Sequence, residues 1–185
     1  MRTRFPRSVL FLTACVTVGL TVLSSCTQDV TSSTPTTTPR IPADAPTATV
    51  AMTSADSTLY KAGPSDQLTY GQNRLVGKAV VAGQPANVEI LGNVQYVRGT
   101  GPFYGFLTVT WANGSSVAFV VQGTATLEDS GATKLASSLV FLAGTGEYEN
   151  GTAVGRFTGA RAAQVGSPIV IRLTMAATAG TPTKK

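Results

Sequence analysis

From about residue 57 onward, apolar and polar residues alternate along the chain, and no stretch has the 3.6-residue period of an amphipathic helix. In the segment 85–99, Val88, Ile90, Val94 and Tyr96 would share one face of an extended strand. Further strands are predicted in the segments 67–82, 134–144, 153–161 and 167–177. The pattern therefore indicates an all-β domain.

The clearest unit in this pattern is a hairpin around Asn113-Gly114. Apolar residues alternate before the dipeptide at Leu107, Val109 and Trp111, and after it at Val117, Phe119 and Val121. Asn-Gly between two such runs is the strongest short-range hairpin signal, because both residues tolerate a positive φ. We therefore expect a tight turn here.

Seven or eight strands fit between residues 57 and 178, with no room for a long helix, so a sandwich and a closed barrel are the two options. The stretches 117–121 and 138–143 have hardly a polar position, whereas a sandwich strand should show one wet face. Strands that are apolar on both sides favour a barrel with an apolar lumen and an outer wall that packs on another subunit. A lumen of this size holds side chains or one small ligand.

The N-terminus has the pattern of a secretory signal. Arg2, Arg4 and Arg7 precede an uncharged apolar run from Ser8 to Ser25. A transmembrane anchor is the alternative, but it needs about 20 apolar residues. This run is interrupted by threonines and a glycine, and no Lys or Arg follows between residues 26 and 39.

Residues 23–26, Leu-Ser-Ser-Cys, resemble a bacterial lipobox, in which the Cys26 thiol receives a diacylglyceryl group and the chain is cut before it. An ordinary signal peptide is the alternative, and it would leave Cys26 an unpaired thiol in an oxidising compartment. We therefore predict a signal peptide over 1–25 and a lipid anchor at Cys26 on an extracytoplasmic face of the cell envelope. Which membrane carries the anchor stays open.

Residues 26–56 are rich in Thr and Pro and poor in large apolar side chains, so we predict a disordered stalk that leads to a barrel domain over 57–178. An extra N-terminal strand in 47–53, Thr-Ala-Thr-Val-Ala-Met-Thr, is the alternative. The last residues, 179–185, are predicted to be a disordered tail.

Composition narrows the chemistry. Removal of Arg2, Arg4 and Arg7 with the signal lowers the formal charge from +5 to +2, and no basic stripe that would bind nucleic acid remains. The chain has no His, which is the commonest general base and metal ligand, and acylation would consume the Cys26 thiol. We therefore expect no cofactor, no metal and no catalytic motif of a familiar kind.

The segment 141–159 contains a run of glycines and aromatic residues with a distinctive spacing, at Gly144, Thr145, Gly146, Tyr148, Gly155, Phe157 and Gly159. This spacing, with the preceding hairpin, resembles the allene oxide cyclase and dirigent-like β-barrels over residues 66–177. The resemblance implies an antiparallel eight-stranded, calycin-like barrel with a central cavity, assembled as a homo-dimer or trimer. It does not carry an activity, since fold alone does not imply function.

Four residues are candidates for a ligand-binding lumen. Trp111 could stack on a ligand or only fill the core, and Tyr96 could donate to a ligand or be a satisfied core group. Phe119 shares the apolar face of its strand. Arg156 could point into the lumen or into solvent.

These features lead to three functional hypotheses. The first is a non-catalytic envelope lipoprotein whose barrel binds a small hydrophobic ligand or a partner. The second is a cyclase-like enzyme that acts on a hydrophobic substrate in the lumen, lined by Tyr96, Trp111 and Arg156. The third is structural or protein-interaction work at the cell surface. A cavity with a buried charge would favour the enzyme, and a cavity lined only by apolar groups would favour the binding protein. A lumen filled by side chains would favour the structural or interaction role.

Overall fold

The computed structural model describes residues 40–162 and 164–181, and most of them belong to β-strands. The strands are β1 (Thr47–Ala62), β2 (Leu68–Val81), β3 (Gln84–Val97), β4 (Gly101–Trp111), β5 (Ser116–Leu127), β6 (Thr133–Thr145), β7 (Thr152–Arg161) and β8 (Ile169–Thr178). Two single-turn helices, η1 (Pro64–Asp66) and η2 (Gly146–Tyr148), join strands. The all-β prediction is confirmed. The predicted signal peptide, Cys26 and the first part of the stalk lie outside the described residues.

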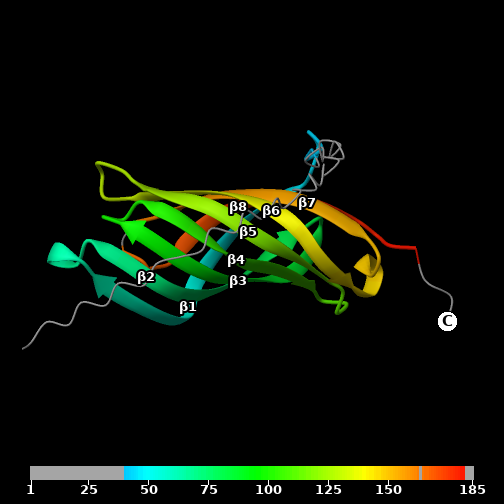
Figure 1. The fold of residues 1–185 in the computed structure, drawn as a ribbon. Helices are drawn as coiled ribbons and strands as arrows, with labels where there is room; N and C mark the ends of the chain where they lie inside the picture. Colours follow the sequence, from blue (N-terminus) through cyan, green and yellow to red (C-terminus); the bar gives the residue numbers. More distant parts are fainter. Residues whose placement is uncertain (1–39, 163, 182–185) are drawn as a thin grey trace, which may run out of the picture. The chain divides into compact units, whose positions relative to one another are not determined.

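The eight strands form one closed antiparallel barrel in which every strand pairs with its neighbours in sequence and β1 also pairs with β8 (Figure 1). The closing seam places Val50 opposite Ile171. Closure leaves no strand edge unpaired. The predicted eight-stranded barrel is confirmed, and the sandwich is wrong.

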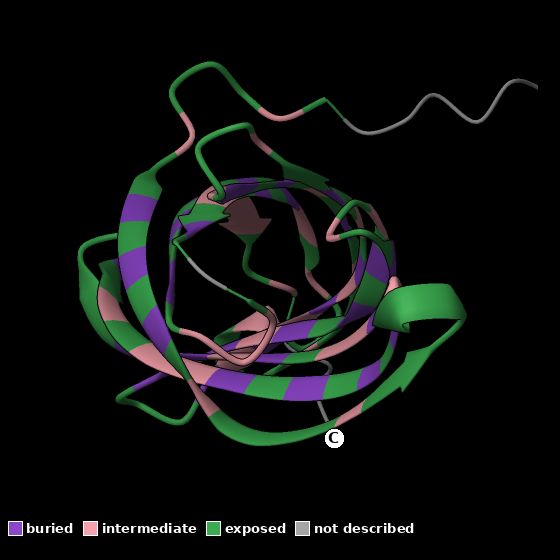
Figure 2. Ribbon diagram, turned by 90° about the vertical axis from the view of Figure 1, so that its left-hand side faces the viewer, coloured by how far each residue is buried: buried purple, intermediate pink, exposed green. Residues whose placement is uncertain are grey.

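Residues that alternate along each strand fill the lumen, which produces the buried and exposed bands in Figure 2. The predicted inward residues of β3, β4 and β5 are buried. Leu107 and Phe119, like Ile171 of β8, have no exposed surface. The apolar face thus lies inside because the barrel encloses it on all sides.

The predicted hairpin turn lies where expected, but its geometry differs. Only Gly114 has a positive φ, of 85°. The Asn113 side chain instead accepts a hydrogen bond from the Ser115 backbone N–H at 3.0 Å. The backbone N–H of Trp111 donates to the Ser115 carbonyl. A loop of three residues therefore closes the hairpin, with its glycine in the left-handed region.

The predicted boundary between stalk and barrel at residue 57 is wrong, because β1 begins at Thr47. The alternative, a strand over 47–53, is the correct interpretation. Ala48, Val50 and Met52 face the core, while Thr49 and Ala51 between them face outward. Small and polar residues dilute the apolar signal, which is why the segment resembled the stalk.

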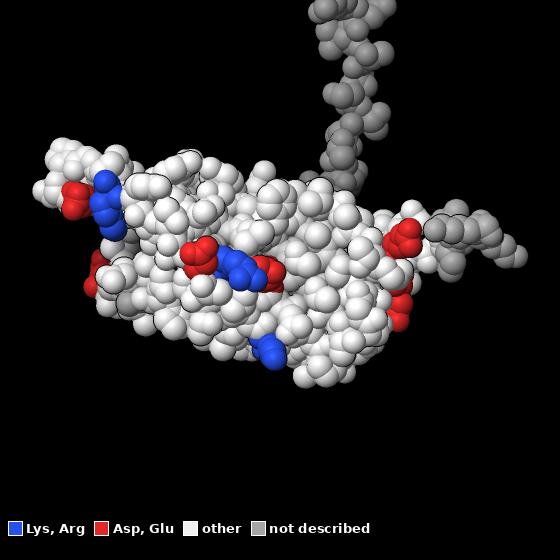
Figure 3. Space-filling view, turned by 90° about the horizontal axis from the view of Figure 1, so that it is seen from below, with Lys and Arg blue, Asp and Glu red and all other residues white. Residues whose placement is uncertain are grey.

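The outer wall carries a row of apolar side chains that runs across five neighbouring strands. The row consists of Leu91, Phe106, Val120, Val140 and Val154, each opposite the next. Leu91 and Phe106 are each 48% exposed and Val140 is 58% exposed. Charged side chains occupy few places on the face shown in Figure 3. The prediction of strands that are apolar on both sides is therefore confirmed.

Residues 38–185 form one compact unit, and the strands described within it need no other segment to pair their edges. Because its core comes from its own strands, this unit is expected to fold by itself. In the part of the chain that the structure describes, no helix is long and apolar enough to cross a bilayer.

Candidate lumenal site

A small cavity of about 50 Å³ lies at one end of the lumen, where β3 ends and β4 begins. Its lining comes from six strands and one loop and consists of Asn73, Leu75, Ile90, Gly92, Val94, Tyr96, Phe103, Leu135, Phe157, Arg161, Val165 and Ile169. Figure 2 looks onto this end of the barrel, and the segment that follows β7 reaches across it. The chain thus partly covers the opening with its own loop.

Three polar side chains interrupt the apolar wall of this cavity. Arg161 is 5% exposed, Tyr96 3% and Asn73 7%, and no Asp or Glu is among the lining residues. The Arg161 guanidinium carbon lies 5.8 Å from the centroid of the Tyr96 ring, within the range of a cation–π interaction. The cavity is therefore apolar with one positively charged corner.

Burial raises the pKa of the Tyr96 hydroxyl, while the charge of Arg161 and its hydrogen bond to Tyr96 offset part of this rise. The hydroxyl consequently keeps its proton at neutral pH and can act as a donor. Asn73 is oriented by the Ser54 hydroxyl, which donates to its amide oxygen at 2.5 Å.

The size of the cavity limits what it can hold. Pockets for drug-sized ligands usually measure about 300–1,000 Å³, whereas one water needs about 10–15 Å³. At about 50 Å³ the space accommodates a small molecule or the end of a longer one. The remaining lumen is filled by side chains such as Phe119.

The structure separates the four predicted ligand-binding residues. Tyr96 lines the cavity. Trp111 is buried away from it, donates its indole N–H to the Val81 carbonyl at 3.1 Å and packs 4.8 Å from the Tyr148 ring. Phe119 lies in the core, with its ring 6.4 Å from that of Phe141.

Arg156 does not line the lumen, so its predicted lumenal placement is wrong. Its neighbour Phe157 faces inward, and alternation therefore turns Arg156 to the outer wall, where it is exposed. The inward charge of this strand is Arg161, which has the same parity as Phe157. Alternation from Phe157 could have identified Arg161. Asn73 gave no signal, because a lone polar residue within the predicted strand segment 67–82 is usually exposed.

The cavity is poorly suited to a cation, since its one charged side chain is an arginine. Across residues 40–162 and 164–181, no three His, Cys, Asp or Glu side chains lie close enough together to hold a metal ion.

No protein-family model, no curated protein and no solved structure matches this chain. The resemblance to allene oxide cyclase and dirigent-like barrels therefore stays a prediction, and function has to be argued from the geometry of the barrel.

Proposed function

We propose that this barrel is a binding module for a small hydrophobic ligand, one end of which enters the cavity beside Tyr96 and Arg161. The observation that carries the proposal is a buried arginine in a largely apolar cavity without an acidic lining residue. Such a cavity favours a ligand with an apolar body and an anionic or strongly accepting end.

The chemistry of the three polar groups supports this ligand class. A guanidinium binds carboxylate oxygens through charge-assisted hydrogen bonds, which are about twice as strong as neutral ones. The Tyr96 hydroxyl, kept neutral by burial, adds a donor of the same kind. The stacked rings of Phe103 and Phe157, with centroids 6.0 Å apart, supply an apolar wall. Short aliphatic or aromatic carboxylic acids satisfy both requirements.

Binding of matched ligand pairs tests this proposal. Residues 38–185 would be titrated with short-chain fatty acids and with their methyl esters, and native mass spectrometry and calorimetry would report binding. The acids should bind more tightly, and Arg161→Gln should weaken their binding by about 10- to 100-fold, as expected for a charged hydrogen bond. Arg74→Gln, which changes an exposed arginine on the outer wall, is the matched control.

A thermal melt of each variant shows whether it still folds, and Tyr96→Phe provides a second, milder change at the same cavity. Equal binding of acid and ester, or no binding of either by the folded wild-type protein, would contradict the proposal.

A second candidate function is the cyclase-like enzyme, which one observation favours. A neutral Tyr96 hydroxyl next to a guanidinium could protonate or hydrogen-bond an oxygen of a bound substrate. A compound recovered with the protein would be incubated with it and followed by mass spectrometry. Turnover by the wild type that Tyr96→Phe abolishes would support the enzyme, and recovery of the compound unchanged would support binding alone.

We further propose that Cys26 is acylated and tethers the barrel to the extracytoplasmic face of a bacterial membrane. The basic start, the apolar run and the Leu-Ser-Ser-Cys motif support this location. Metabolic labelling with an azido fatty acid in a bacterial host tests it. Cys26→Ser should lose the label, while Cys15→Ser, which changes the other cysteine, should keep it.

We also propose that the barrel assembles as a homo-dimer or trimer through the outer row of Leu91, Phe106, Val120, Val140 and Val154. Three members of this row are exposed and two, Val120 and Val154, are half-buried. A continuous apolar row across five strands is unusual for a monomer and is typical of an interaction surface. We expect a second copy of this chain to cover the row, because strands that are apolar on both sides already indicated an outer wall that packs on another subunit.

A further inference from the structure

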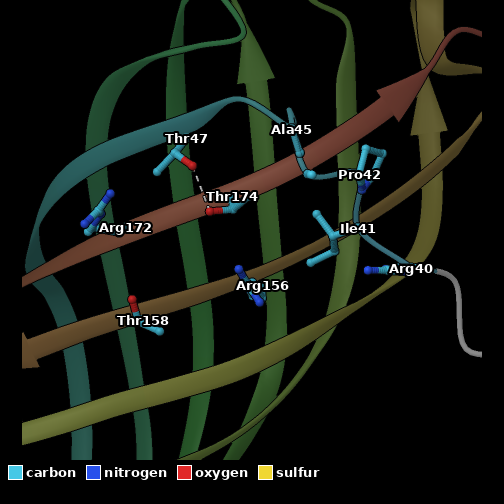
Figure 4. Close-up of a pocket in the computed structure, with 10 residues that line it drawn as sticks. Arg40, Ile41, Pro42, Ala45, Thr47, Arg156, Thr158, Arg172 and Thr174 are labelled. Atoms are coloured by element: carbon cyan, nitrogen blue, oxygen red, sulfur yellow. Dashed lines mark hydrogen bonds between the residues drawn. The ribbon is translucent and has the colours of Figure 1, made fainter.

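A groove of about 900 Å³ lies on the outside of the barrel, between the segment 40–46 and strands β7 and β8 (Figure 4). It is lined by Arg40, Ile41, Pro42, Ala43, Ala45, Thr47, Arg156, Thr158, Arg172 and Thr174. Three arginines and three threonines therefore share one hollow, on the opposite side of the wall from the lumen.

The register of two strands brings two of the arginines together. Arg156 of β7 lies opposite Thr174 of β8, and Arg172 lies opposite Thr158, so the two arginines are diagonal neighbours on the outer face. Diagonal side chains of this length reach one another. Both project from regular, paired strands and are held on a rigid wall.

The third arginine comes from the segment that precedes β1. A turn in this segment joins the Ala45 N–H to the Pro42 carbonyl at 3.2 Å, and the Met175 N–H donates to the Pro46 carbonyl at 3.2 Å. The segment is thus fastened to β8, and Arg40 extends from it over the wall that carries Arg156 (Figure 4).

The groove concentrates positive charge without an acidic counterpart. No Asp or Glu lines it, and Asp44 of the same segment is exposed and not part of the lining. The ion pairs found among the described residues join Arg74 to Glu89 and Lys134 to Glu128, both elsewhere on the barrel. Like charges this close repel one another, and an anion between them would relieve the repulsion.

We propose that this groove binds a phosphate-bearing anion, with the guanidinium groups of Arg40, Arg156 and Arg172 on its oxygens. One guanidinium fork satisfies a planar carboxylate, whereas a tetrahedral phosphate accepts hydrogen bonds from several directions at once. The Thr158 hydroxyl adds a neutral donor beside the arginines. The hydroxyls of Thr47 and Thr174 are hydrogen-bonded to each other at 2.9 Å, so this pair can offer one further donor. Because the groove is larger than a free phosphate, the phosphate belongs to a larger molecule, either a phospholipid headgroup or a soluble phosphate ester.

Two sets of probes distinguish these sources. Residues 38–185 would be titrated with glycerol 3-phosphate by calorimetry and by NMR of the arginine side chains. The same protein would be sedimented with vesicles of phosphatidylglycerol in phosphatidylcholine and with vesicles of phosphatidylcholine alone. The double variant Arg156→Gln, Arg172→Gln should weaken binding at least about tenfold, and added salt should weaken the wild type, since exposed charges are screened. Arg74→Gln and Arg98→Gln, which change exposed arginines outside the groove, are the controls.

Each outcome bears on the proposal. Binding of glycerol 3-phosphate that depends on the two arginines supports a soluble ester, and binding only to phosphatidylglycerol vesicles with the same dependence supports a lipid headgroup. If sodium acetate competes as well as phosphate does, the groove is a general anion site and the proposal is wrong. It is equally wrong if neither probe binds, or if the double variant binds like the controls.

Discussion

The indole nitrogen of Trp111 donates a 3.1 Å hydrogen bond to the carbonyl oxygen of Val81, which joins the last residue of β4 to the last residue of β2 inside the barrel. The Tyr148 ring of η2 packs against the same indole. Trp111 is 4% exposed and therefore seals the end of the lumen away from the cavity. A polar tip that finds a partner while the ring fills space is the usual arrangement for a buried tryptophan.

Trp111→Phe should lower the free energy of unfolding by about 2–3 kcal/mol, because it leaves the Val81 carbonyl without its donor and creates a small cavity. Urea denaturation followed by circular dichroism measures the change, since the substitution removes the only tryptophan. Phe106→Leu, on the outer face of the same strand, should change stability by less than about 0.5–1 kcal/mol. Similar losses for the two variants would show that Trp111 does not seal the core.

Tyr96 should make stability sensitive to alkaline pH. Because burial raises its pKa in the folded state, the unfolded chain loses this proton first as the pH rises above about 10. Stability is therefore fully present below that pH and is lost as the pH rises through the folded-state pKa.

Urea denaturation at a series of pH values between neutrality and the alkaline limit measures this slope. Tyr96→Phe should flatten it relative to Tyr104→Phe, which removes a hydroxyl from the outer wall. Tyr148, whose pKa is raised by burial and by Glu147, should account for part of the slope that remains. An unchanged slope in Tyr96→Phe would mean that this hydroxyl is accessible to water in the folded protein.

Gly105 lies within β4 with a φ of 155°, and a Cβ there would lie 1.9 Å from the Leu91 carbonyl oxygen. Gly105→Ala should therefore cost about 3 kcal/mol or more, since neither backbone can retreat. Gly114, at the hairpin turn, has a φ of 85° and open space around its Cβ position, so Gly114→Ala should cost about 1–2 kcal/mol. Comparison of the denaturation midpoints of the two variants separates the cost of the steric clash with Leu91 from the cost of a positive φ. Equal midpoints would show that the clash contributes nothing.

Local alternation was sufficient to predict the fold class and the inner wall. The lumen is apolar along most of its length, so inward residues such as Phe119 and Ile171 stand out from their neighbours. The same rule failed at β1, where Ala48 is small and the inward residues are separated by Thr49 and Ala51. Patterns report the contrast between two faces, and that contrast is weak in this strand.

Both candidate sites depend on neighbours that are distant in sequence. Arg161 reaches Tyr96 only because the barrel closes, and the outer groove combines residue 40 with residues 156 and 172. Strand register and closure follow from pairing over the whole sheet, for example of Val50 with Ile171, and no local pattern contains them. The inward orientation of Arg161 could be predicted from alternation along its strand, but its contact with Tyr96 could not.

The outer apolar row predicts a change of assembly on substitution. Phe106→Gln should shift residues 38–185 from dimer or trimer toward monomer, because it places a polar amide within the proposed interface. Size-exclusion chromatography with light scattering at several protein concentrations measures the mass. Val170→Gln changes another exposed apolar residue, on β8, and should leave the mass unchanged. A wild-type protein that is monomeric at all concentrations would contradict the assembly.

The first strand decides whether the barrel closes, and a truncation series tests this directly. A fragment of residues 57–185 lacks Thr47–Met52, the whole stretch of β1 that pairs with β8. It also loses the buried side chains of Val50 and Met52. An open sheet with an exposed β8 edge and a gap in its core should aggregate or show no cooperative unfolding. The fragment 46–185 keeps the strand and should unfold within about 1 kcal/mol of 38–185, since surface segments contribute little. Calorimetry of the three fragments measures their unfolding temperatures. If the fragment 57–185 unfolds cooperatively at the same temperature as the fragment 46–185, the seam between β1 and β8 is dispensable.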